Sequence, residues 1–167
     1  RRRLGEENAL FVKADFKEVK QILSELAVEK INGAILDLGV SSFQIDEAER
    51  GFSYGKEAPL DMRMDRNAAL DAHQVVNGYS EAELTKLIYA YGEERFAPRI
   101  ARAICQERPI ETTVALAEIV KNAIPAAARR TGGHPAKKTF QAIRIEVNAE
   151  LAGLEQAVED FIDALAP

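Results

Sequence analysis

The feature that most constrains the fold is a short apolar run, Ala34-Ile-Leu-Asp-Leu38, which stops at a long polar loop. The run does not alternate between apolar and polar residues, and this is typical of a parallel strand buried on both faces. Its Asp37 comes at the carboxyl end, where ligands bind in open α/β sheets. We therefore predict an α/β fold with a ligand site directly after this strand.

A second β-prone run, Ala9–Lys13, comes earlier in the chain. Asp15 is placed to cap a helix over about Phe16–Glu29, which would join the two runs into a strand, helix, strand unit. Two parallel strands cannot stand alone, because a buried parallel sheet needs neighbours on both sides. We therefore expect further strands outside these residues or from another chain.

From Ser80 onward the sequence predicts helices. Ser80 caps a first helix that stops at Gly92, Pro98 lies in the first turn of a second, and Thr112 or Thr113 starts a third.

Apolar residues at steps of three and four from Phe140 to Leu165 then predict one long helix or two collinear ones, with Gly153 as the bend. The chain reads as a piece of α/β sheet joined to a helical region.

Composition excludes several classes of site. The 167 residues contain one cysteine, Cys105, so an intrachain disulfide is impossible, and the two histidines have no metal-ligand spacing. We predict no metal site. No apolar segment approaches the roughly 18 to 20 residues that cross a bilayer, so a cytoplasmic location is expected.

The net charge of -5 argues against uniform attraction to nucleic acid, but the stretch from Lys121 to Ile145 contains no acid. Such a block can be an ordinary solvated helix face. Because it surrounds a Gly-Gly loop, we favour an anionic partner. The basic residues predicted to bind RNA phosphates are Arg129, Arg130, Lys137, Lys138 and Arg144.

Several side chains near the first strands could carry chemistry. Asp37 could hold a ligand's hydroxyl or amine, or cap the turn into Gly39. Phe16 could stack on a planar ring or act as a core staple. Hydrogen bonds to a flat polar group such as a base, or local bonds within the loop, could come from Ser41, Ser42 and Gln44.

Two charged groups have structural alternatives. Asp61, Arg63 and Asp65 could position a substrate, but the alternating Met62 and Met64 favour an ion pair that orders the loop. Three arginines later in the chain are spaced so that they lie on one helical face. They could pair with phosphates or with nearby acids, and they are Arg95, Arg99 and Arg102.

Several sequence blocks resemble, in order, a family of bacterial 16S ribosomal RNA cytosine methyltransferases, RsmH or MraW. The resemblance spans almost the whole chain. The matching blocks are Ala14-Asp-Phe16, Asp37 to Tyr54, Pro59 to Asp65, Tyr91-Gly-Glu-Glu-Arg-Phe96, and His134-Pro-Ala-Lys-Lys-Thr-Phe-Gln-Ala-Ile-Arg-Ile145.

This resemblance implies a partial class I, Rossmann-like methyltransferase sheet with a mostly α-helical inserted domain. It implies that residues 1–46 belong to the sheet domain, that 47–145 form the inserted domain, and that 146–167 return to the first domain. The family's glycine-rich loop after its first strand and everything from its fifth strand on are missing here. Phe43 stands where the family usually has proline.

The resemblance also implies an activity, which is transfer of a methyl group from S-adenosylmethionine to the exocyclic amine of a cytosine in 16S ribosomal RNA. Phe16, Asp37 and Gln44 would then contact the methyl donor. Our own hypothesis is that Asp37, Ser41 and Ser42 hold the cytosine amine. The alternative is a non-catalytic helical module that binds RNA or a protein surface.

Overall fold

The computed structural model describes residues 9–41, 47–130 and 133–167, with only the backbone of Arg130. The chain divides into two compact units, one made of Arg1–Asp37 with Leu151–Pro167 and the other of Leu38–Glu150. No helix among the described residues combines the length and the apolar character that crossing a membrane requires.

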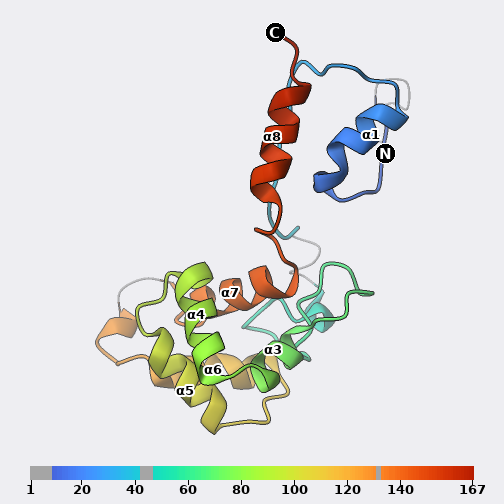
Figure 1. Cartoon of the computed structure of the whole chain (residues 1–167). Helices are drawn as coiled ribbons and strands as arrows, with labels where there is room; N and C mark the ends of the chain where they lie inside the picture. Colours follow the sequence, from blue (N-terminus) through green and yellow to red (C-terminus); the bar gives the residue numbers. More distant parts are fainter. Residues whose placement is uncertain (1–8, 42–46, 131–132) are drawn as a thin grey trace. The chain divides into compact units, whose positions relative to one another are not determined.

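The first unit pairs an early helix with the last one (Figure 1). It contains a 3-10 turn η1 (Phe16–Glu18) and the helices α1 (Val19–Glu25) and α8 (Leu154–Ala164). The predicted cap is confirmed, because the Asp15 carboxylate accepts a hydrogen bond of 3.0 Å from the Lys17 N–H. Ion pairs from Lys20 join α1 to α8, reaching Asp160 at 2.7 Å and Asp163 at 3.2 Å.

Helix α1 ends four residues earlier than predicted, at Glu25. Ala27 has a left-handed backbone conformation with φ of 53°, and the Val28 N–H turns back to the Leu23 carbonyl at 2.9 Å. This reversal satisfies the last carbonyls of the helix without a glycine.

Neither predicted strand forms in the described residues, because Ala9–Lys13 and Ala34–Leu38 have no strand conformation there. The only pairing in this unit's described part is an isolated parallel bridge between Ile31 and Leu165. The side chain of Ile35 is 101% exposed and that of Leu10 is 71% exposed. Apolar runs of this kind become strands only when neighbouring strands bury both faces, and the described residues supply none.

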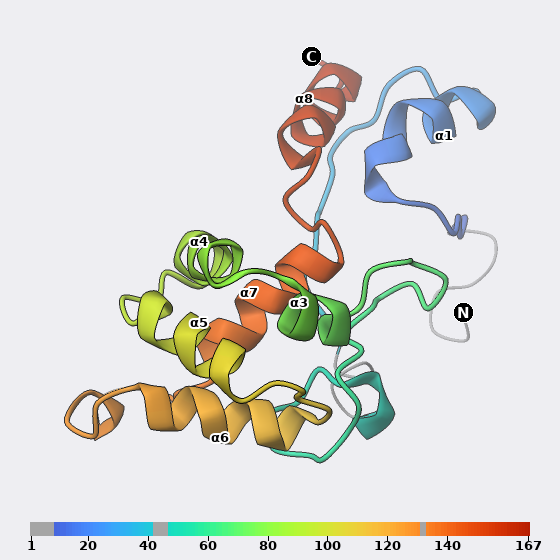
Figure 2. The same cartoon turned by 60° about the horizontal axis from the view of Figure 1, so that its bottom comes forward.

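The second unit is helical and has its own core (Figure 2). Helix α4 packs against α5 and α7, α5 packs against α6, and α3 packs against α7. Its elements are η2 (Ala48–Arg50), α3 (Ala72–Gly78), α4 (Glu81–Gly92), α5 (Ala97–Gln106), α6 (Thr113–Ala123), η3 (Ala128–Arg130) and α7 (Lys137–Val147).

The helix boundaries of this unit largely confirm the sequence prediction. Ser80 and Glu83 form a complete capping box on α4, which ends at Gly92, and the Thr112 side chain caps α6. Pro98 lies in the first turn of α5. Because α5 begins only at Ala97, Arg95 precedes the helix, and the prediction that it shares a helical face with Arg99 is wrong.

The long periodic stretch at the end of the chain forms two helices. Helix α7 ends at Val147, and left-handed residues follow at Ala149, with φ of 47°, and at Gly153, with φ of 75°. Gly153 caps the start of α8. The break at Gly153 is therefore confirmed, and α7 and α8 belong to different units.

Candidate nucleic-acid interface

The residues predicted to hold the methyl donor and the cytosine fall in both units. Phe16 opens η1 and is half-buried, and Asp37 is exposed at the end of its segment. Ser41 is exposed at the start of the second unit. Ser42 and Gln44 lie outside the described residues.

Three of the predicted RNA-binding residues meet in one groove of the second unit. The groove has a volume of about 730 Å³ and lies between the turn that follows α4 and the segment from η3 to the start of α7. We call it the basic groove, and its cationic lining is Arg95, Arg129, Lys137 and Lys138. Helix packing brings these residues together across 43 positions of sequence, and Arg95 was not predicted to join them.

Two acids also line the basic groove, but one of them is turned into the protein. Glu94 is 7% exposed, and its carboxylate accepts a hydrogen bond of 3.0 Å from the Phe96 N–H. The carbonyl of Glu93 accepts a bond of 2.9 Å from Lys138 Nζ, while its side chain is exposed. The groove lining therefore carries four cationic side chains against two acidic ones.

The start of α7 carries charges of unusual sign. Lys137 and Lys138 occupy its first turn, which holds no acid. The positive end of a helix dipole disfavours cations, at a cost of about 0.3 to 1 kcal/mol each. Both lysines are exposed. A bound anion would offset this cost, because backbone N–H groups and the ammonium groups would then face the same negative charge.

The remaining predicted basic residues differ in how they are held. Arg129 is half-buried, with its Nε donating to the Ile124 carbonyl at 2.7 Å. Arg144 lies outside the basic groove and forms a two-point ion pair with Glu150, with distances of 2.8 and 2.9 Å. The side chain of Arg130 lies outside the described part of the chain.

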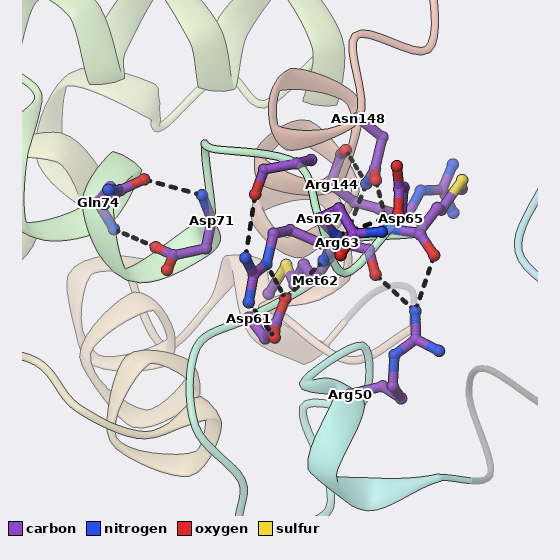
Figure 3. Close-up of polar contacts among 12 residues, drawn as sticks. Arg50, Asp61, Met62, Arg63, Asp65, Asn67, Asp71, Gln74, Arg144 and Asn148 are labelled. Atoms are coloured by element: carbon purple, nitrogen blue, oxygen red, sulfur yellow. Dashed lines mark hydrogen bonds and ion pairs between the residues drawn. The ribbon is translucent and has the colours of Figure 1, made fainter.

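The loop from Asp61 to Asp65 in the same unit is held by a polar network (Figure 3). The Arg63 guanidinium donates to both Asp61 carboxylate oxygens, at 2.8 and 3.0 Å. This hydrogen-bonded pair holds the pKa of Asp61 below its ordinary value of 3.8. The ordering role predicted for the pair is therefore confirmed, and Met62 is buried beside it at 1% exposure.

Two residues that the sequence did not reveal fix the same loop. Arg50 donates from η2 to the carbonyls of Arg63 and Met64, at 2.6 and 3.1 Å (Figure 3). Asn148, just after α7, accepts from the Met64 N–H at 2.6 Å and donates to the Met62 carbonyl at 2.8 Å. These contacts hold Met62 in a left-handed conformation, with φ of 58°.

Nothing local in the sequence marks Arg50 or Asn148, because their partners are backbone groups far along the chain. A signal did exist for α3. Asp71 and Gln74 form a capping box, with bonds of 2.8 and 3.1 Å, and their three-residue spacing is readable in advance.

Comparison with known proteins covers nearly the entire chain. Residues 2–167 match the MraW methylase family. A small-subunit ribosomal RNA methyltransferase H from Brevibacillus brevis is 55% identical over 159 residues, which are 93% of this chain and 51% of the relative.

Two further relatives of the same name agree. The protein from Clostridium botulinum is 56% identical over 162 residues, covering 95% of this chain and 52% of the relative. The protein from Thermobifida fusca is 54% identical over 158 residues, covering 93% and 48%. The chain thus spans about half the length of these relatives, and the resemblance in the sequence is confirmed. The chain belongs to the MraW methylase family.

Proposed function

We propose that this chain is part of a cytoplasmic enzyme that transfers a methyl group from S-adenosylmethionine to the exocyclic amine of a cytosine in 16S ribosomal RNA. The observation that carries the proposal is the family match over residues 2–167, together with relatives named for small-subunit ribosomal RNA. A Rossmann-like sheet, completed by strands outside the described residues, would support the donor.

The residues of this chain would contribute mainly by placement. The donor supplies an electrophilic methyl carbon. The residues of this chain would have to hold the cytosine amine in line with that carbon. Such a transfer needs in-line alignment more than acid-base power.

Asp37, Ser41 and Ser42 would hold the amine through hydrogen bonds. Phe16, Asp37 and Gln44 would meet the donor. The exposed carboxylate of Asp37 and the half-buried ring of Phe16 are accessible enough for these roles.

Methylation by the whole protein tests this assignment. Small ribosomal subunits treated with the protein and a labelled donor would be digested to nucleosides and analysed by mass spectrometry. We expect N4-methylcytidine with the unaltered protein and a large loss with Asp37→Ala, while Glu29→Ala, an exposed acid of the same unit, keeps normal turnover. Normal turnover by Asp37→Ala would remove Asp37 from the site, and a different methylated nucleoside would refute the cytosine amine as acceptor.

We assign the basic groove to ribosomal RNA phosphates. The support is the joint placement of Arg129, Lys137 and Lys138 in one groove, with the two lysines at an acid-free helix start. Lysine and arginine contacts to phosphates position an RNA without reading its sequence. Arg130 is assigned with them from the sequence, whereas the contribution of Arg144 should be smaller because Glu150 already pairs with it.

The second candidate is a non-catalytic helical module that binds RNA or a protein surface. The observation in its favour is that the second unit has its own buried core, while no sheet forms in the described residues. Calorimetric titration of S-adenosylmethionine into this chain and into the whole protein separates the two. Binding by the whole protein favours the enzyme, and binding by neither favours the module.

A further inference from the structure

A second hollow of the helical unit lies beside the basic groove. It has a volume of about 340 Å³, within the usual range for ligand pockets. We call it the aromatic slot, and its defining residues are Phe52, Ser53, Tyr54, Met62, Phe140 and Gln141. Tyr54 and Phe140 meet edge to face, with ring centroids 5.8 Å apart and an interplanar angle of 88°.

The aromatic slot and the basic groove share a wall. Tyr54 lines the slot and His134 lines the groove, and their rings are stacked with centroids 4.2 Å apart and planes 12° apart. The Ala136 N–H donates to His134 Nδ1 at 3.2 Å, which fixes the orientation of that ring. Lys137 and Gln141 of α7 line both hollows, so the two lie side by side.

We propose that the aromatic slot receives one unpaired nucleobase of the RNA strand whose phosphates lie in the basic groove. This inference rests on the proposed RNA-binding function. The half-buried rings of Phe52 and Tyr54 are the ones on which a base could stack, since Phe140 is only 4% exposed. Ser53 and Gln141 supply a hydroxyl and an amide for the edge of the base. Lys137 at the shared wall would meet the adjoining phosphate.

The position of the slot also fits a base rather than an apolar protein side chain. Proteins that recognise single-stranded RNA combine aromatic platforms with a cationic track for the backbone. Val40 lines the slot, directly before Ser41 of the predicted acceptor loop. A base held here would therefore lie next to the segment expected to receive the target cytosine.

The test is a scan with abasic nucleotides. A fluorescent pyrimidine RNA of about ten nucleotides, within typical single-strand site sizes, would be bound to the chain and followed by anisotropy. An abasic nucleotide would replace each residue in turn. We expect one position to lose affinity by roughly 5- to 150-fold, the range for one stacked base. The 2-aminopurine base placed at that position should be quenched on binding.

Tyr54→Leu keeps an apolar side chain but removes the ring, and should abolish the penalty at that position. Tyr89→Leu is the matched control, because Tyr89 is 67% exposed on α4 and lines neither hollow, and it should keep the penalty. Lys138→Ala should weaken binding at every position and also keep the penalty.

The possible failures are distinguishable. Salt-dependent RNA binding with no penalised position would overturn the slot and leave the groove assignment intact. A penalty that survives in folded Tyr54→Leu, or 2-aminopurine that stays bright in the unaltered chain, would also overturn the slot. The quenching measurement needs no variant, so it decides the question even if Tyr54→Leu does not fold. Absence of any RNA binding would refute both the groove and the slot.

Discussion

Replacing Gly92 with alanine should destabilise the helical unit, although alanine is the better helix former. A Cβ at this position would lie 2.7 Å from the carbonyl oxygen of Lys138 and 3.2 Å from its carbonyl carbon. The oxygen is about 0.7 Å closer than the 3.4 Å at which ordinary contact begins. It belongs to the backbone of α7, so relief requires the two helices to move apart.

Overpacking of this kind costs about 1 to 3 kcal/mol, and the intrinsic gain from glycine to alanine in a helix is about 0.5 to 1 kcal/mol. The net loss should be centred on about 1.25 kcal/mol, which corresponds to a fall in Tm of roughly 3 to 5 °C for a chain of this size. The displaced carbonyl is that of Lys138, whose side chain lines the basic groove. RNA affinity should therefore fall as well.

Gly78→Ala is the matched control. Gly78 ends α3, and a Cβ there would meet nothing within 4 Å. This variant should be stabilised by about 0.5 to 1 kcal/mol. Thermal and urea denaturation followed by circular dichroism measure both. If Gly92→Ala were as stable as Gly78→Ala, the close packing of α4 on α7 would be refuted.

Three further predictions concern the polar groups of the same unit. Asn148→Ala should lower the unfolding free energy by about 1 to 3 kcal/mol, because two hydrogen bonds to the loop backbone are lost. The control Asn122→Ala, at an exposed position, should change the unfolding free energy little. Equal effects of the two substitutions in urea denaturation would contradict this prediction. The pKa of Asp61 is lowered by Arg63, so its stabilisation is present above pH 3.8 and is lost as the pH falls through the folded-state value. As the pH is lowered, the unfolding free energy of Asp61→Asn should therefore fall less steeply than that of the unaltered chain. Parallel curves of unfolding free energy against pH would contradict stabilisation by the Asp61–Arg63 ion pair. Burial raises the pKa of Tyr79 to about 12, so its stabilisation is complete below pH 10 and is lost as the pH rises through 12. Phenolate absorbance should show one late-titrating tyrosine that is missing in Tyr79→Phe, and an unchanged titration would refute the assignment.

The elements that the sequence predicted well are those decided by nearby residues. The capping box of Ser80 and Glu83, the stop at Gly92 and the cap at Thr112 each involve atoms within four residues. The ion pair of Asp61 and Arg63 is equally local. The partners in such hydrogen bonds lie within a few residues of each other, so the sequence itself indicates them.

The elements that differ depend on distant partners. The runs Ala9–Lys13 and Ala34–Leu38 have strand composition, but a strand needs a neighbour and the described residues offer none. Helix α1 ends early because the chain reverses at Ala27, a left-handed alanine that no propensity favours.

The basic groove also combines features that the sequence predicted with features that it could not predict. An acid-free window was visible in the sequence, and three of its cations do meet. The window could not reveal that Arg144 would pair with Glu150, which lies outside the window in the turn after α7, or that Arg95 would join the groove from the turn after α4.

The salt dependence of RNA binding tests the central claim most directly. Each phosphate contact with a single strand contributes a slope of about 0.7 in log affinity against log salt. Replacing Lys137 and Lys138 with alanine should therefore reduce the slope by about 1.4. Replacing Lys86 and Lys121, two lysines outside the groove, removes the same charge and should leave the slope unchanged. Equal slopes for the two double variants would contradict the assignment of the basic groove to RNA phosphates.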